Sequence, residues 1–247
     1  TFAAGLALSG IKPVIAIYST FLQRAYDQLI HDIAIQNIPM LFAIDRAGLV
    51  GADGATHSGN FDISFMRCIP NLILMAPSNE SECFEMLSFG YEYNGICAVR
   101  YPRGQSPNNR IHQLKEPIRL GCANKVRTGK KVAILAFGPI IETCREVADE
   151  IDASLIDMRF IKPIDKKMIK KISKDHELLV SVEENAVNGG AGSAVLEVIS
   201  ESNIACKTLV IGIPDKFFEH ASQQEVLKAC GLDKQSIVRK IVKQLNG

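Results

Sequence analysis

Apolar and polar positions recur along this chain in two regular patterns, one typical of buried strands and one typical of helices. Short continuous apolar runs predict strands, whereas apolar residues that recur every three or four positions predict one buried face of a helix. The predicted strands cover 13–18, 39–44, 72–75, 97–101, 132–137, 154–158, 178–182 and 209–213. The predicted helices cover 24–36, 79–93, 140–151, 166–173, 191–200, 223–229 and 234–245. Alternating strands and helices predict right-handed βαβ units with largely parallel sheets, so the expected fold class is α/β.

The alternation stops between 102 and 121, where prolines punctuate a polar stretch that is typical of a linker. Lysine is rare before this stretch and common after it, whereas arginine dominates before it. Arginine is favoured over lysine where a planar oxyanion is bound by two parallel hydrogen bonds. We therefore predict two domains, each a largely parallel sheet flanked by helices, over 1–108 and 122–247, with a linker over 109–121.

Composition and charge narrow the range of functions. The 247 residues include 28 Lys and Arg against 27 Asp and Glu, and this net charge of +1 offers no electrostatic basis for binding nucleic acid or an anionic membrane surface. No apolar run approaches the roughly 18 residues that a membrane span needs. The seven cysteines include no CxxC pair, which argues against a zinc site or a disulfide framework and favours the reduced thiols of a cytoplasmic protein. We expect no metal ligands in this chain, and neither a nucleic acid nor a membrane as a partner.

The stretch 45–59 has the strongest chemical signal in the sequence. It is rich in glycine and follows a predicted strand, and ligands of α/β proteins bind at the carboxyl ends of parallel strands. Arg46, Asp53 and His57 place a permanent cation, an anion and a group that titrates near neutral pH in one loop. This mixture suits a small polar substrate, although the same residues are compatible with a solvated loop whose charges are incidental.

A second candidate segment begins where the first predicted strand ends. Arg24 lies in the first turn of a predicted helix, where the helix dipole disfavours a cation and a bound anion would offset that cost. Phe21 offers an apolar face for a flat ring, if it is exposed. The alternative is that Phe21 belongs to the core and that Arg24 pairs with Asp27 or Gln28.

Arg103 also follows a predicted strand, so it is expected at the same sheet edge as Arg24 and Arg46. Three arginines at one edge would form a phosphate clamp through charge-assisted hydrogen bonds. The glycine-rich stretch 189–193 resembles a phosphate-binding turn, but its spacing departs from GxGxxG and no Walker lysine follows it. We interpret 189–193 as a structural turn that could be placed against another domain.

Six segments together carry a resemblance to a known family. They are 18–28, 45–54, 100–104, 157–163, 182–185 and 189–193. The first three of these segments read YSTFLQRAYDQ, DRAGLVGADG and RYPRG. The chain resembles the 1-deoxy-D-xylulose-5-phosphate synthase family over essentially its whole length. The resemblance implies a thiamine diphosphate-dependent transferase that joins pyruvate to D-glyceraldehyde 3-phosphate with loss of carbon dioxide. The product of that family feeds the synthesis of isoprenoids, thiamine and pyridoxal phosphate.

The resemblance also implies the domains and the roles of residues. The chain corresponds to the pyrimidine-binding and C-terminal domains of a homodimeric enzyme, whose first domain holds the diphosphate and Mg²⁺. Phe21 would stack on the aminopyrimidine ring, and His57 would transfer or orient a proton near the reacting carbons. The residues implied to bind glyceraldehyde 3-phosphate are Tyr18, Arg24, Arg46, Asp53 and Arg103.

The start of the chain leads to a further expectation. The sequence begins at Thr1 in what reads as the middle of an apolar helix, and the acidic residue that activates the cofactor in the family would lie just before it. We therefore expect a fragment of a longer enzyme that is inactive by itself. Two alternatives remain open, a beta-type subunit of a 2-oxoacid dehydrogenase and a non-catalytic dimerisation module.

Overall fold

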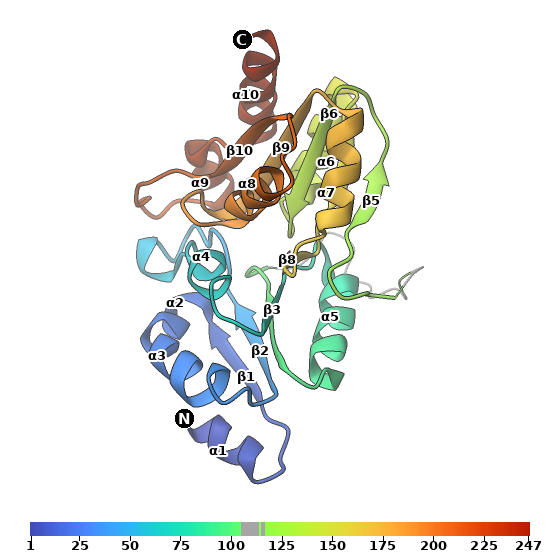
Figure 1. Cartoon of the computed structure of the whole chain (residues 1–247). Coiled ribbons are helices and arrows are strands. Elements are labelled where there is room, and N and C mark those ends of the chain that lie inside the picture. The colour runs from blue at the N-terminus through green and yellow to red at the C-terminus, as the bar shows by residue number, and fades with distance from the viewer. Residues whose placement is uncertain (105–113, 115–116) are drawn as a thin grey trace.

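The structure is a computed structural model that describes residues 1–104, 114 and 117–247. The described strands form two five-stranded sheets, one in each half of the chain. In Figure 1 the sheet of the first half lies below that of the second half, with helices on both faces of each sheet. The predicted α/β fold class, with two largely parallel sheets flanked by helices, is confirmed. Most of the predicted linker, 109–121, lies outside the described residues.

The first sheet has the strand order β1-β2-β4-β3-β8. Its strands are β1 (Val14–Tyr18), β2 (Met40–Asp45), β4 (Ile96–Arg100), β3 (Leu72–Met75) and β8 (Phe160–Lys162). Strands β1 to β4 are parallel, so their carboxyl ends lie at the same edge. Every residue of β3 and β4 is buried, which explains why these strands are apolar throughout except for Arg100 at the end of β4.

The second sheet has the strand order β10-β9-β6-β7-β5. Its strands are β10 (Lys207–Ile213), β9 (Leu178–Ala186), β6 (Val132–Phe137), β7 (Ser154–Asp157) and β5 (Asn124–Arg127). The first four are parallel, and β5 pairs with β7 in the antiparallel direction. Strand β5 was not predicted from the sequence, because its residues are half-buried or exposed and form no apolar run.

Strand β8 joins the two halves. It lies in the second half of the chain, yet it pairs with β3 at the edge of the first sheet. The sequence predicted a strand over 154–158, whereas the chain leaves β7 at Asp157, turns at Arg159 with a φ of 56°, and enters the other sheet. A strand of three residues is too short for a periodicity argument, so only the tertiary structure identifies its partner.

The helices are close to those predicted in most places. The longer ones are α5 (Glu80–Glu92), α6 (Ile141–Ile151), α7 (Lys166–Asp175), α8 (Ala191–Glu201), α9 (Gln223–Cys230) and α10 (Lys234–Asn246). The shorter ones are α1 (Phe2–Leu8), α2 (Ser19–Leu22), α3 (Tyr26–Gln28) and α4 (Asp62–Met66). Side-chain oxygens cap the N-termini of α5, α7, α9 and α10, and α9 has a complete capping box.

The predicted helix over 24–36 differs from the observed segment. The helical path begins at Ser19 and changes its winding, with a 3₁₀ turn over Gln23–Ala25 and a π turn over Leu29–Ala34. The buried residues of the π turn are Leu29, Ile33 and Ala34. They are four and five positions apart, a spacing that a π turn brings to one side, so the wide turn directs all of them into the core.

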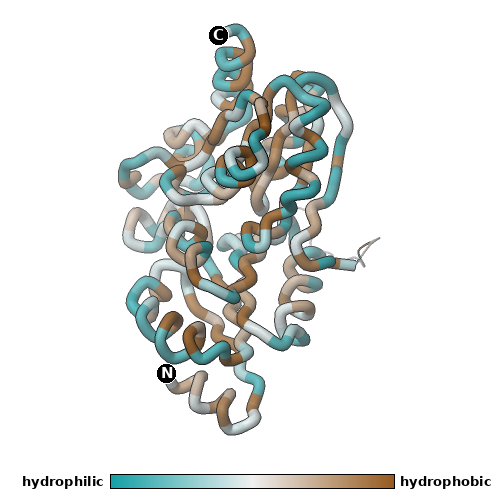
Figure 2. The backbone as a smooth tube through the Cα atoms, viewed as in Figure 1, coloured by the Kyte–Doolittle hydropathy of each residue, from teal (hydrophilic) through white to brown (hydrophobic). Residues whose placement is uncertain are grey.

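One apolar core is continuous between the halves. A single cluster of buried side chains includes Phe42 and Ile44 of β2 together with Leu135 and Phe137 of β6. Figure 2 shows apolar segments along the strands, whereas the helices alternate apolar and polar residues as expected for elements with one buried face. No helix in the described ranges is long and apolar enough to cross a membrane.

Candidate functional site

The loop that follows β2 folds back on itself. The Gly48 N–H donates to the Gly59 carbonyl at 2.8 Å, and the Gly59 N–H donates to the Gly48 carbonyl at 2.9 Å. A Cβ at Gly59 would lie 2.7 Å from the Cβ of Ser19, so glycine lets the loop close against the start of α2. The loop therefore holds its charged residues beside the segment that follows β1.

Asp53 is the centre of a charged cluster. Its carboxylate accepts hydrogen bonds from Arg103 Nη1 at 2.8 and 2.9 Å and forms an ion pair with Arg46 Nη1. Two guanidinium groups share one carboxylate, so the cluster has an excess of one positive charge. Arg46 and Asp53 are about three-quarters covered, whereas half of the Arg103 side chain is exposed. The structure thus brings together three of the residues that the sequence assigned to phosphate and substrate binding.

An aromatic group adjoins this cluster. The Arg46 guanidinium carbon lies 4.3 Å from the ring centroid of Tyr18, which stacks on Phe21 at 5.1 Å. The His57 ring meets Phe21 edge-on at 5.8 Å. Phe21 is 48% exposed, so the alternative that it belongs to the core is wrong. His57 Nδ1 lies 3.0 Å from the Thr56 hydroxyl, and its Nε2 has no partner among the described residues.

Arg24 is not bonded to any of these residues in the described part of the chain. It lies in the 3₁₀ turn, is exposed, and makes no hydrogen bond or ion pair within the described part of the chain. The alternative partner Asp27 pairs instead with His31 Nδ1 at 2.8 Å. The structure brings two of the three predicted arginines to one carboxylate, and the role of Arg24 stays a prediction.

Buried polar atoms, two hydroxyl groups and one amide oxygen, occur in the segments next to the aromatic residues. Ser19 Oγ, Thr20 Oγ1 and Asn60 Oδ1 are buried and have no hydrogen-bond partner among the described residues. Unpartnered buried polar atoms are costly unless a ligand satisfies them. An open aromatic face beside unpartnered hydroxyl groups fits a flat heteroaromatic ring such as the aminopyrimidine of thiamine diphosphate. No cluster of three metal-ligating side chains occurs in the described ranges.

A buried ion pair lies just behind the exposed cluster. Arg100 donates to Asp62 through Nε at 2.8 Å and through Nη2 at 3.1 Å, and its Nη2 also donates to the Glu184 carbonyl at 3.1 Å. Both charged side chains are almost completely covered. Arg100 therefore fixes the end of β4 to the second half of the chain, three residues before Arg103. The sequence analysis assigned no role to Arg100, because its burial cannot be read from its position.

The glycine-rich stretch 189–193 is a structural turn that contacts the first half. The N–H groups of Ala191 and Gly192 donate to the Glu183 carboxylate at 2.7 and 2.8 Å, so the N-terminus of α8 binds an acid of its own chain. Burial raises the pKa of Glu183 to about 7, although both N–H donors favour its ionised form. The Ser64 hydroxyl of the first half donates to the Asn188 carbonyl at 2.9 Å.

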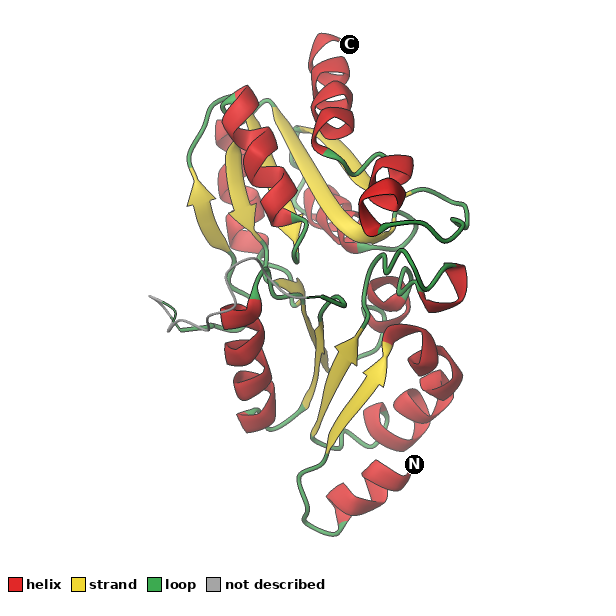
Figure 3. Cartoon of the chain, turned by 180° about the vertical axis from the view of Figure 1, so that it is seen from behind, coloured by secondary structure: helices red, strands yellow, loops and turns green. Residues whose placement is uncertain are grey.

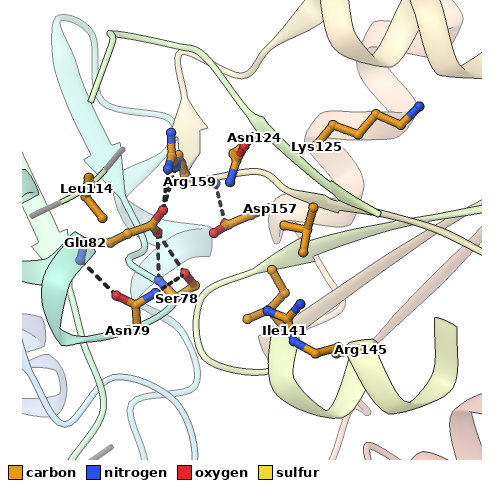
Figure 4. Close-up of a pocket in the computed structure, with 11 residues that line it drawn as sticks. Ser78, Asn79, Glu82, Leu114, Asn124, Lys125, Ile141, Arg145, Asp157 and Arg159 are labelled. Carbon is orange, nitrogen blue, oxygen red and sulfur yellow. Dashed lines mark hydrogen bonds and ion pairs between the residues drawn. The ribbon is translucent and has the colours of Figure 1, made fainter. Parts of the chain in front are cut away.

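A cavity of about 440 Å³ lies elsewhere, between α5 and the strands β5 and β7. Figure 4 shows Glu82 and Arg159 paired at its base, at 2.7 Å, with Asp157 beside them. Burial raises the pKa of Asp157 well above its usual value, and the nearby charge of Glu82 adds to this. None of the predicted site residues lines this cavity, whose buried charged groups are already bound to one another.

Two protein-family models match this chain, one in each half. The model described as "Transketolase, pyrimidine binding domain" matches residues 1–108, and "Transketolase, C-terminal domain" matches 121–237. The chain is 55% identical over 242 residues to a 1-deoxy-D-xylulose-5-phosphate synthase of Haemophilus influenzae (strain PittGG), covering 98% of this chain and 39% of that protein. The chain belongs to the 1-deoxy-D-xylulose-5-phosphate synthase family. A synthase of Nitrosomonas europaea is 52% identical over 241 residues, again with 98% of this chain and 39% of that protein covered.

Solved structures share the fold of both halves. A split gene transketolase, described as an inactive beta4 tetramer, superposes with a TM-score of 0.88 at 27% identity, covering 99% of this chain and 79% of that one. A transketolase of Campylobacter jejuni superposes with a TM-score of 0.73 at 19% identity, covering 94% of this chain and 35% of that one, and this likeness concerns the fold alone. The chain spans about two-fifths of the length of the curated relatives that it matches.

Proposed function

We propose that this chain supplies the acceptor-binding part of a thiamine diphosphate-dependent synthase that joins pyruvate to D-glyceraldehyde 3-phosphate, releasing carbon dioxide and forming 1-deoxy-D-xylulose 5-phosphate. The observation that carries the proposal is the convergence of Arg46 and Arg103 on Asp53 beside an open aromatic face. Guanidinium groups bind phosphate through short charge-assisted hydrogen bonds. A site with an excess positive charge next to an apolar ring suits a phosphorylated aldehyde bound beside a flat heteroaromatic cofactor.

Each residue of the cluster has a distinct task in this proposal. Arg46 and Arg103 bind the phosphate of the acceptor, and Tyr18 holds the Arg46 guanidinium in place by a cation–π contact. Asp53 keeps both arginines oriented and accepts hydrogen bonds from hydroxyl groups of the acceptor. His57 offers Nε2 to the acceptor oxygen, because its Nδ1 is engaged by Thr56. Arg24, in the turn over Gln23–Ala25, would add its positive charge to the electrostatic potential that attracts the phosphate.

The residues near Phe21 fit thiamine diphosphate. Phe21 would stack on the aminopyrimidine ring, and the hydroxyl groups of Ser19 and Thr20 would hydrogen-bond its polar edge. When bound, thiamine diphosphate supplies the electron sink that the loss of carbon dioxide requires. The ligands of its diphosphate and of Mg²⁺ are proposed to lie outside these 247 residues.

The acceptor site can be tested by kinetics in a chimaera. The matching segment of the Haemophilus influenzae synthase, 55% identical over 242 residues, would be replaced by this chain. Arg103→Ala is expected to raise the Michaelis constant for glyceraldehyde 3-phosphate at least ~10-fold, since it removes one charge-assisted contact of ~1.5–3 kcal/mol. Arg239→Ala, an exposed arginine of α10, is the matched control. An unchanged Michaelis constant in Arg103→Ala would remove Arg103 from the phosphate site.

By itself the chain is proposed to be inactive, to self-associate as a homodimer in the cytoplasm, and to bind thiamine diphosphate only weakly. The likeness to an inactive beta4 tetramer of a split gene transketolase supports self-association without activity. Light scattering would give the mass of the assembly, and calorimetry would give the affinity for thiamine diphosphate. Micromolar cofactor binding by residues 1–247 would contradict this proposal.

A further inference from the structure

The substrate loop of the first half is held by the second half of the chain. Figures 1 and 3 both show the segment after β2 lying against the loop before α9. A Cβ on Gly51 would lie 2.6 Å from the backbone nitrogen of Gln223, so glycine permits direct backbone contact there. The loop that holds Arg46, Asp53 and His57 is thus positioned from outside its own sheet.

Leu49 is the point of attachment. Its side chain is 1% exposed and packs in the core of the second half, in the cluster that contains Val182, Ile211 and Ile213. The first half of the chain thereby places one apolar side chain into the core of the other half. Leu49 lies three residues after Arg46 and four before Asp53. Fixing Leu49 therefore restricts the positions that both charged residues can take.

Two side chains of the second half bind the peptide groups of Leu49. The Leu49 N–H donates to Glu184 Oε2 at 3.3 Å, and the Leu49 carbonyl accepts a hydrogen bond from Gln223 Nε2 at 3.1 Å. A Cβ on Gly48 would lie 2.9 Å from Glu184 Oε2, so glycine permits the close approach of this carboxyl group. Both hydrogen-bonding groups of the Leu49 backbone are satisfied across the boundary between the halves.

Glu184 is itself firmly held. It belongs to β9, which lies between β6 and β10, and its carbonyl accepts a hydrogen bond from Arg100. Its side chain is buried, with its carboxyl group directed to the loop. Strand β9 thus presents one acceptor to the Leu49 N–H, and Gln223 at the start of α9 presents one donor to the Leu49 carbonyl, so the peptide groups on both sides of Leu49 are held.

We propose that Glu184 and Gln223 are positioning residues for the acceptor site, which act by fixing the backbone of Leu49 so that Arg46 and Asp53 stand opposite Arg103. This inference rests on the proposed function and deepens it, since it gives the second half of the chain a role in substrate affinity. Neither residue touches the acceptor. The consequence is that their loss weakens acceptor binding while the chemistry with pyruvate is retained.

The first test measures amide hydrogen exchange in the 247-residue chain. Glu184→Ala is expected to speed exchange in the peptide 47–59 at least ~10-fold, with exchange in β6 unchanged. Glu184→Gln retains an oxygen that can accept from Leu49, so it is expected to exchange at the wild-type rate. Gln223 lies on an exposed helix start, so Gln223→Ala provides a variant with little risk to folding, and Gln224→Ala is its matched control. Exchange unchanged in Gln223→Ala and Glu184→Ala would overturn the proposal.

The second test separates binding from chemistry in the chimaeric synthase. Glu184→Ala and Gln223→Ala are expected to raise the Michaelis constant for glyceraldehyde 3-phosphate ~5- to 10-fold, with kcat and the Michaelis constant for pyruvate within ~2-fold of wild type. A general structural defect would instead lower kcat and affect both substrates. If Arg103→Ala leaves the Michaelis constant for glyceraldehyde 3-phosphate unchanged, the proposed function fails. The rate of amide hydrogen exchange in peptide 47–59 still decides whether Glu184 and Gln223 hold the loop. Equal effects on both substrates would refute the positioning role.

Discussion

Two Arg–Asp pairs, whose arginines lie three residues apart along the chain, illustrate opposite uses of the same chemistry. Arg100 and Asp62 are 2% and 0% exposed, whereas Arg103 and Asp53 are 51% and 24% exposed. The buried pair has no access to solvent or ligand, and it is further bound to the Glu184 carbonyl. The exposed pair is open to solvent and to a ligand, and its ion pair contributes little to stability because solvent screens the attraction. Burial thus distinguishes a structural ion pair from a binding one.

Removal of the buried acid should have the largest effect on stability. Asp62→Ala leaves the Arg100 guanidinium buried without its counter-charge, and breaking such a pair costs about 3–5 kcal/mol. We expect the free energy of unfolding in urea to fall by that amount. Asp62→Asn, whose amide oxygen can still accept from Arg100, is the matched control and should lose less. A loss below ~1 kcal/mol in Asp62→Ala would show that the buried pair contributes little to the stability of the fold.

The next effect is a pH dependence that arises from Glu183. Burial raises its pKa from 4.5 to about 7, so the folded state favours the neutral carboxyl group. This contribution is fully present below pH 4.5 and is lost as the pH rises through 7. The loss amounts to at most about 3–4 kcal/mol, because one pKa unit corresponds to about 1.4 kcal/mol.

The measurement is the slope of unfolding free energy against pH between 4.5 and 7 in wild type and in Glu183→Gln. Glu184 and Asp157 also have raised pKa values, because both are buried. The Glu183→Gln variant should therefore keep part of the wild-type slope. Glu183→Gln is expected to be less stable at low pH, since one amide oxygen replaces two acceptors, but to show a shallower slope. Identical slopes would remove Glu183 from the titration.

The smallest expected effect on stability belongs to the exposed pair. Arg103→Ala should change the free energy of unfolding by less than ~1 kcal/mol, because half of its side chain is in solvent. The same substitution is expected to weaken acceptor binding at least ~10-fold. Urea unfolding would give the change in stability of Arg103→Ala for comparison with Asp62→Ala, and substrate kinetics would give its change in acceptor binding. A stability loss comparable to that of Asp62→Ala would remove the distinction between the two pairs.

Much of the fold could be predicted because burial leaves a clear pattern in the sequence. Strands β3 and β6 are buried along their whole length, so their residues are apolar without interruption. The site residues Arg46, Asp53 and Arg103 follow such strands, and parallel strands bring their carboxyl ends to one edge. By contrast, Arg24 also follows a strand, but it is exposed and makes no hydrogen bond or ion pair with the other site residues in the described part of the chain.

What the amino-acid sequence by itself determined is therefore local and periodic: most strands and helices, the α/β class and the candidate residues expected at one sheet edge. Only the tertiary structure decided which partner each of the less regular segments takes. Strand β8 crosses into the first sheet, Leu49 enters the core of the second half, and Glu184 receives the Leu49 N–H. The Leu49–Glu184 hydrogen bond alone joins residues 135 positions apart. A partner at that separation is selected by packing and hydrogen-bond geometry, and neither leaves a periodic trace in the sequence.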